Sequence, residues 1–107
     1  MRIRTWNIEA MTGYKPKTTY YEDFSIADAF GIAAVKDTYK SAMKTADFMG
    51  YEYLTELVMA LNWKIWEHYE HNEPLARVYN DLWEKASEHA VKTLKGDELQ
   101  YYFRTID

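Results

Sequence analysis

The chain contains no cysteine, only two prolines and only four glycines among its 107 residues. The lack of cysteine excludes disulfides, thiolate metal sites and cysteine nucleophiles, and it is compatible with the cytoplasmic location that we expect. The glycines are scattered singly, so no glycine-rich phosphate loop is present. No apolar run is long enough to span a membrane, and the first residues lack the apolar core of a signal peptide.

What is present describes a single, well-packed domain. Hydrophobic residues make up 48% of the chain and aromatic residues 17%. The net charge of −4 is unevenly distributed, because residues 1–20 carry four basic residues against one acidic residue, a balance of +3, which leaves −7 on residues 21–107. We therefore predict a basic, extended arm at 1–20 and a helical domain at 21–107. An acidic body disfavours nucleic acid and favours basic partners.

Residues 25–46 have helical spacing with a change of phase in the middle. Ser25 is a suitable N-cap, and Gly31 lies where the phase changes. One face carries Ile26, Ala29, Phe30 and Ala33, and a different face carries Ile32, Val35, Tyr39, Ala42, Met43 and Ala46. Either a short helix ends at Gly31 and a second begins, or one helix is buried on two sides.

The strongest helical pattern covers residues 51–71, after a break at Gly50. Asn72 and Pro74 then predict the start of another helix, which Gly96 ends. Such a short connection predicts that the two helices form a central antiparallel hairpin. Asp97 can cap a last short helix, although YYFRTI also has strand propensity. The predicted fold is mostly α, a small bundle of three or four helices.

The stretch LNWKIWEHYEHNEP, residues 61–74, raises the question of a metal or acid/base site. His68 and His71 lie on neighbouring faces of one helix, but a third ligand is missing. In a hairpin that turns near Asn72, His89 lies roughly 18 Å further along the axis than His68, from the rise of about 1.5 Å per residue. No catalytic motif occurs. We predict no metal, no cofactor, no catalytic residue and no enzymatic activity, and we identify no small-molecule substrate.

Aromatic side chains on the helix at 51–71 give the first candidate binding surface. Met59, Trp63 and Trp66 lie away from the leucine stripe, among the acidic residues Glu52, Glu56 and Glu70. Either the N-terminal arm or the helix that begins at Ser25 covers them, or they form an exposed patch that binds a protein partner or a second copy of the chain. We expect Trp66 to be the more buried of the two tryptophans and Trp63 the more exposed.

A second candidate is a DNA-binding unit at residues 25–44. Ile26, Ala27, Gly31 and Ile32 resemble the centre of a helix-turn-helix, in which the glycine makes the turn. Lys36, Lys40 and Lys44 would form a basic ridge toward phosphates. Val35 comes earlier after the glycine than the motif requires, and the rest of the domain is acidic, so this remains the alternative hypothesis.

Three runs extend these patterns over nearly the whole chain: TTYYEDFSIADAFGIAAVKDTYK, YLTELVMALNWKIWEHYEHNEPLARVYNDLWEKA and LKGDELQYYFRT. They resemble a family of small, uncharacterised proteins encoded on conjugative elements and phages of gut Firmicutes. The resemblance brings no catalytic or binding residues with it. It implies an accessory protein of a mobile element, which acts in the bacterial cytoplasm, often by binding and inhibiting or adapting a host or element protein. By analogy alone, an acidic domain of this size could also occupy a basic nucleic-acid channel, as some inhibitors of defence nucleases do.

Overall fold

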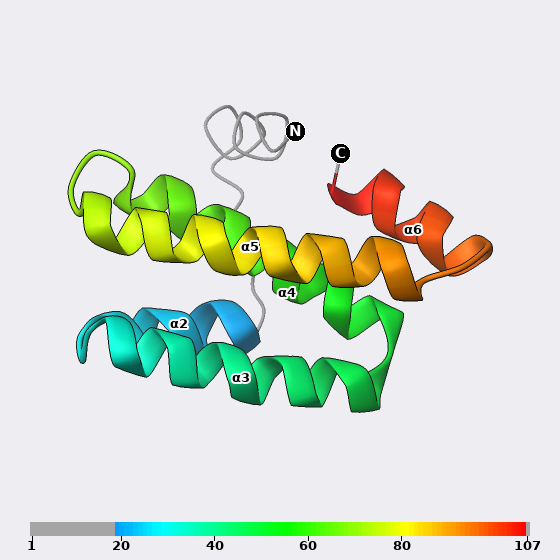
Figure 1. Ribbon diagram of the computed structural model, residues 1–107, viewed down its shortest axis with the longest axis horizontal. Coiled ribbons are helices and arrows are strands. Elements are labelled where there is room, and N and C mark those ends of the chain that lie inside the picture. Colours follow the sequence, from blue (N-terminus) through cyan, green and yellow to red (C-terminus); the bar gives the residue numbers. More distant parts are fainter. Residues whose placement is uncertain (1–18, 107) are drawn as a thin grey trace.

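The computed structural model describes residues 19–106, which form five α-helices (Figure 1). They are α2 (Thr19–Asp28), α3 (Ile32–Met49), α4 (Tyr51–His68), α5 (Glu73–Thr93) and α6 (Asp97–Ile106). The described range is therefore mostly α-helical, as the sequence predicts, but it holds more helices than the three or four expected. Residues 97–106 are helical, which decides against the strand alternative. Residues 1–18, most of the predicted basic arm, lie outside the described residues.

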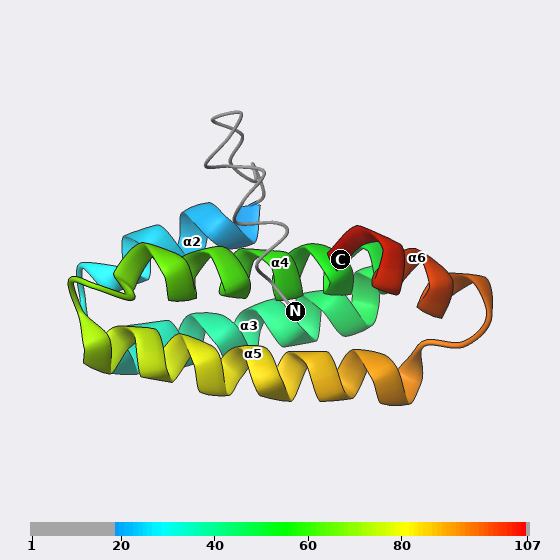
Figure 2. The same cartoon turned by 90° about the horizontal axis from the view of Figure 1, so that it is seen from above.

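Helix α4 lies at the centre and contacts each of the other four helices. Helix α5 runs alongside α4 in the opposite direction, as Figure 2 shows, and α3 and α6 each run opposite to the helix that precedes them. The stripe predicted from the sequence is buried in α4, where Leu57, Val58 and Leu61 are fully enclosed. Together with Leu82 of α5 they belong to one continuous apolar core.

The phase change at Gly31 corresponds to a sharp turn between two helices. Gly31 has a φ of 107°, a conformation that side-chain-bearing residues rarely adopt. Its N–H donates to the carbonyl of Ala27 over 3.1 Å, which ends α2. The N-cap role predicted for Ser25 is wrong, because α2 already begins at Thr19. Ser25 lies inside the helix, and its hydroxyl donates to the Tyr21 carbonyl over 3.0 Å.

The start of α5 follows the sequence signals closely. The Asn72 side-chain oxygen accepts a hydrogen bond from the N–H of Leu75 over 3.3 Å, and Pro74 lies in the first turn, so the predicted cap is confirmed. Helix α5 ends at Thr93, however, before Gly96, which has a φ of 56° in the connection to α6. Asp97 is the first residue of α6 and not its cap.

Within residues 19–106, every helix is too short or too polar to cross a lipid bilayer.

Candidate functional site

A lysine lies fully buried in the middle of the bundle. Lys64 of α4 has no exposed side-chain surface, and lysine is almost never buried in this way unless it is paired. Its ammonium group lies 2.5 Å from Oδ2 of Asp28 in α2 and 2.7 Å from Oε2 of Glu67 in α4. It also donates to the Ser25 hydroxyl over 3.2 Å. The buried charge is thus neutralised and its donors are satisfied, which is the condition for burial at tolerable cost.

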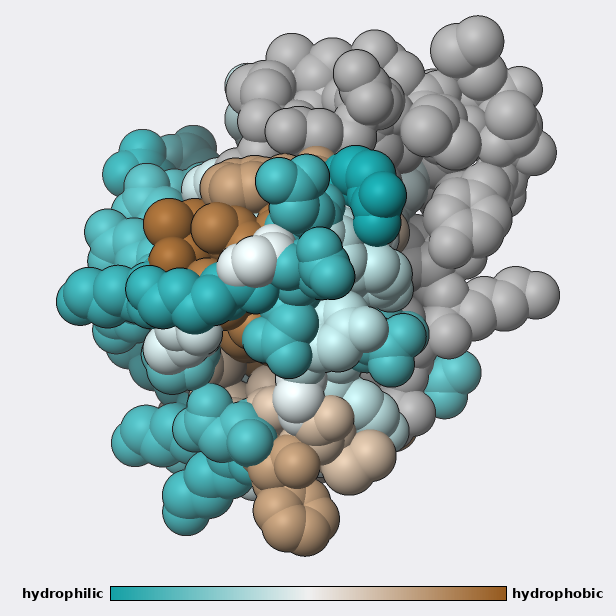
Figure 3. Space-filling view, turned by 90° about the vertical axis from the view of Figure 1, so that its right-hand side faces the viewer, coloured by the Kyte–Doolittle hydropathy of each residue, from teal (hydrophilic) through white to brown (hydrophobic). Residues whose placement is uncertain are grey.

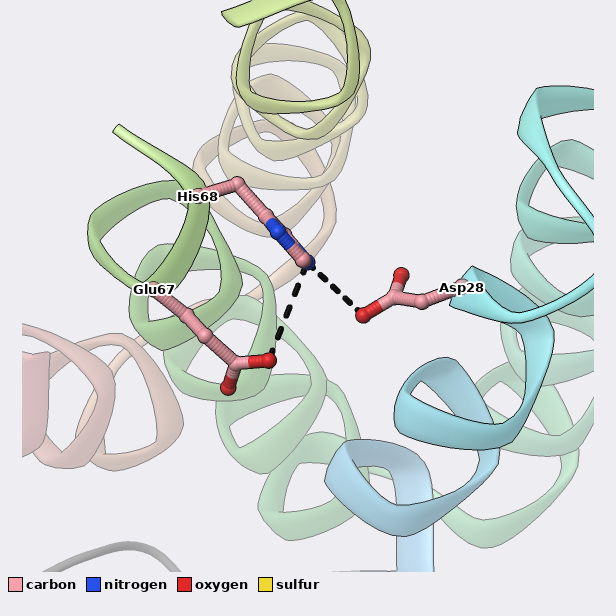
Figure 4. Close-up of side chains that lie close together, drawn as sticks. All are labelled: Asp28, Glu67 and His68. Carbon is pink, nitrogen blue, oxygen red and sulfur yellow. Dashed lines mark hydrogen bonds and ion pairs between the residues drawn. The ribbon is translucent and has the colours of Figure 1, made fainter. Parts of the chain in front are cut away.

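Further polar groups from three helices complete this arrangement, which we call the Lys64 cluster: Asp28, Lys64, Glu67, His68 and the hydroxyls of Tyr21 and Tyr79. Nε2 of His68 lies 2.7 Å from Oδ2 of Asp28, and Figure 4 shows Asp28 reaching it from α2. The Tyr79 hydroxyl, from α5, donates to the other oxygen of Asp28. Tyr21 donates in the same way to Glu67. The cluster therefore joins α2 to both α4 and α5.

Two side chains of the Lys64 cluster have shifted pKa values with clear causes. Burial acts to raise the pKa of Glu67, but hydrogen bonds from Lys64 and Tyr21, with the nearby positive charges, outweigh burial, so that the pKa is lowered. Burial raises the pKa of Tyr79 far above its usual range, and the hydrogen bond to the Asp28 carboxylate adds to the rise. Glu67 is thus held as a carboxylate and Tyr79 as a neutral hydrogen-bond donor.

The same residues include three potential metal ligands, which the sequence had not brought together. One ligand atom each from Asp28, Glu67 and His68 lie within 4.8 Å of one another. The Lys64 ammonium, however, already lies against both carboxylates, and a metal ion would have to displace this buried cation. His71 is exposed and belongs to none of these contacts, and His89 of α5 instead lies 3.2 Å from Asp47 of α3. The geometry therefore favours an internal ion-pair cluster that fastens α2.

A groove lies at the surface between α2 and α3. These two helices run side by side in opposite directions (Figure 1). The volume of the groove is about 510 Å³. Its lining has an apolar part (Ile26, Ala27, Phe30, Ala34, Ala42 and Tyr53), three hydroxyl residues (Thr38, Ser41 and Thr45) and two carboxylates (Asp23 and Asp37). Ile26 is 64% exposed and Phe30 77% exposed, and the described lining contains no basic residue. We call this the α2–α3 groove.

Another large exposed apolar side chain, that of Phe48, lies outside the α2–α3 groove. Phe48 is 88% exposed at the end of α3, yet it lines none of the grooves discussed here. Figure 3 views the end of the molecule where α3 ends and α6 begins, and its apolar areas are separated by hydrophilic side chains. A further groove lies near the start of α5, where Arg77 and Glu73 pair with each other over 2.6 Å. The α2–α3 groove holds two large exposed apolar side chains, Ile26 and Phe30, and its described lining has no basic residue. The groove near the start of α5 instead holds Tyr69 and Arg77.

The tryptophan patch predicted from the sequence is only partly at the surface. Trp63 is 2% exposed, whereas Trp66 is half-buried with its ring 5.4 Å from that of Tyr69. The expectation that Trp63 is the more exposed residue is therefore wrong. Of the remaining residues of the patch, Met59 and Glu56 are half-buried, and Glu52 and Glu70 are exposed. Whether the N-terminal arm covers this surface concerns residues outside the described range.

Only two of the three lysines of the DNA-binding hypothesis line a common groove. Lys36, Lys40 and Lys44 are all exposed on α3. Lys36 and Lys40 line a groove together with Lys85 of α5, a partner that spacing within one helix could not reveal, while Lys44 lies outside it. In Figure 1, α2 and α3 fold back along each other, unlike the steep crossing of a helix-turn-helix.

Comparisons of the chain with protein-family models, curated proteins and solved structures find no match.

Proposed function

We propose that the protein is a non-enzymatic protein-binding module whose docking surface is the α2–α3 groove. The observation that carries the proposal is the exposure of Ile26 and Phe30 beside a concave apolar floor. Large apolar side chains in a groove are typical anchors of protein interfaces, because their burial by a partner removes apolar surface from water. The burial of Trp63 makes the tryptophan patch a weaker candidate for the first contact.

The partner that suits this surface is a protein segment that combines large apolar residues with lysine or arginine. Asp23 and Asp37 supply negative charge to the groove, and its described lining offers no positive charge in return. The net charge of −7 over residues 21–107 extends this attraction beyond the contact itself. Complementary charge increases the rate of association and disfavours acidic competitors.

The scaffold of this surface is the central hairpin of α4 and α5, to which the Lys64 cluster fastens α2. In the setting implied by the resemblance to mobile-element proteins, the module acts in the bacterial cytoplasm on a host or element protein. Inhibition of a defence nuclease fits this chemistry, because an acidic domain can occupy a basic nucleic-acid channel. Self-association, in which the same groove binds a second copy of the chain, is the alternative to binding a different protein.

A DNA-binding accessory factor is the alternative function. The turn at Gly31 between two helices and the three exposed lysines of α3 favour it. The antiparallel course of α2 and α3 and the acidic body oppose it. A mobility shift of duplex DNA at low salt that is lost in a Lys36, Lys40 and Lys44 triple alanine variant would establish this alternative.

The proposal is tested with the full chain as bait in a lysate of a gut bacterium, followed by quantitative mass spectrometry. Phe30→Ser removes an anchor from the groove, and Phe48→Ser is the matched control, since both side chains are mostly exposed and neither supports the core. We expect a protein that is retained by the wild-type chain and by Phe48→Ser but lost with Phe30→Ser. Equal retention by all three baits, or no specific retention, would contradict the assignment of the groove.

A further inference from the structure

The opposite side of α3 lines a second groove, which it shares with α5. This α3–α5 groove has a volume of about 260 Å³. It is lined by Lys36, Tyr39 and Lys40 from α3 and by Val78, Asp81, Leu82 and Lys85 from α5. At 100° per residue, these α3 residues lie about 180° from those of the α2–α3 groove. The two surfaces can therefore be tested independently.

Three lysines in the α3–α5 groove have no partner of opposite charge among residues 19–106. In the described range, Lys36, Lys40 and Lys85 make no ion pair within 4.0 Å, in contrast to Lys64 and Arg77. One carboxylate, Asp81, lines the same groove, so the groove carries a balance of +2 in a chain whose net charge is −4. Such a concentration of positive charge within an acidic protein attracts anions to one place.

The groove also offers a neutral donor and an apolar floor. The Tyr39 ring is half-buried, and its hydroxyl has no hydrogen-bond partner among residues 19–106. Burial raises the pKa of Tyr39, so the hydroxyl keeps its proton and can donate it. Val78, which is half-buried, and Leu82, which is buried, line the same groove as the lysines. An anion that also has an apolar or aromatic body would therefore find contacts for both parts.

We propose that the α3–α5 groove binds a small organic phosphate of about the size of a nucleoside monophosphate. The three ammonium groups contact the phosphate oxygens, and Tyr39, Val78 and Leu82 contact the organic body. The volume of about 260 Å³ lies just below the range of roughly 300–1,000 Å³ for drug-sized ligand sites, which limits the ligand to a small one. A nucleic-acid polymer fits less well, because Asp81 and the acidic body would repel the phosphates on either side.

The test is a titration of the ¹⁵N-labelled full chain, followed by NMR at low salt. Adenosine monophosphate is the probe, with inorganic phosphate and adenosine as the two part-ligands. We expect saturable shifts at the backbone amides of Lys36, Tyr39, Lys40 and Lys85, and weaker binding of each part-ligand. Equal affinity for inorganic phosphate would overturn the assignment of an organic body, and the absence of saturable shifts would overturn the site.

Two matched triple variants separate the groove from general charge attraction. Replacing Lys36, Lys40 and Lys85 by Gln removes the groove lysines, and replacing Lys44, Lys92 and Lys95 by Gln removes as many exposed lysines elsewhere. Far-UV circular dichroism checks that both variants remain folded. We expect the groove variant to weaken binding about tenfold or more, since hydrogen bonds to charged groups are lost, and the control to change it little.

Equal weakening in the two triple variants would show diffuse attraction and overturn the proposal. Binding of duplex DNA that depends on the groove lysines, without binding of adenosine monophosphate, would replace the proposed ligand with nucleic acid. Neither outcome depends on the protein-binding role of the α2–α3 groove, because no residue lines both grooves.

Discussion

Replacing Lys64 by Met should destabilise the fold strongly, although methionine fills a similar volume. Lys64 is fully buried, and Asp28, its closest partner, has a side chain only 14% exposed. Removal of the ammonium leaves this carboxylate beside Glu67 without the buried cation that both carboxylates contact. Breaking a buried pair in this way costs about 3–5 kcal/mol, a large share of the roughly 5–15 kcal/mol that stabilises a domain.

Urea unfolding, followed by circular dichroism at neutral pH, measures this loss of stability. Lys44→Met is the matched control, because Lys44 is exposed on α3, and its replacement should change the free energy of unfolding by less than about 0.5 kcal/mol. Adding Asp28→Asn to Lys64→Met should restore part of the loss, since the unpaired carboxylate is then removed. A loss below about 1 kcal/mol for Lys64→Met would refute the view that the Lys64 cluster fastens α2.

Two other predictions concern the core and the pH dependence of stability. Leu61→Ala and Leu82→Ala should each lower the free energy of unfolding in urea by about 2–5 kcal/mol, because both leucines are buried. Val91 is half-exposed, so Val91→Ala should lower it by less than about 1 kcal/mol. Similar losses at all three positions would contradict the assignment of Leu61 and Leu82 to the core. The pKa of Glu67 is lower in the folded chain than in the unfolded one, so its contribution is present above about pH 4.3 and is lost as the pH falls through the folded-state value. Glu67→Gln should therefore flatten the fall in stability as the pH drops below about 4.3, and an unchanged pH profile would argue against the ion pair.

Signals that lie close together in the sequence predicted much of the fold. The Asn72 cap and Pro74 indicated where α5 begins, because a cap is a contact between neighbouring residues. The change of phase at Gly31 indicated a boundary, and the turn conformation shows that two helices meet there. Ser25 misled the prediction, because a serine within a helix can return its hydroxyl to a carbonyl four residues earlier, as it does here.

The Lys64 cluster could be anticipated only in part. Lys64 and His68 follow Leu57 and Leu61 at helical spacing, so the sequence places both on the buried stripe of α4. That spacing was a usable signal for a buried cation. Its main partner, Asp28, lies on another helix and is brought close only by tertiary packing, which spacing within one helix does not specify.

The binding surfaces also depend on contacts between helices, which spacing within one helix does not specify. Sequence spacing placed Trp63 away from the leucine stripe, but α4 is surrounded by helices and buries side chains on several faces. Ile26 and Phe30 were grouped on one face of a predicted helix, but α2 ends at Asp28 and Phe30 lies in the turn that follows. Only the packing of α2 and α3 reveals that both side chains stay exposed. The convergence of Lys85 with Lys36 and Lys40 likewise requires two helices.

Site-specific photo-crosslinking tests the central claim, binding through the α2–α3 groove, most directly. A benzoylphenylalanine side chain is introduced at Phe30, which lines the groove, or at Phe48, a position outside it that is also mostly exposed. After irradiation in a bacterial lysate, we predict a covalent adduct from position 30 whose crosslinked peptide combines basic and large apolar residues. Equal adducts from both positions, or adducts from position 48 alone, would contradict the account.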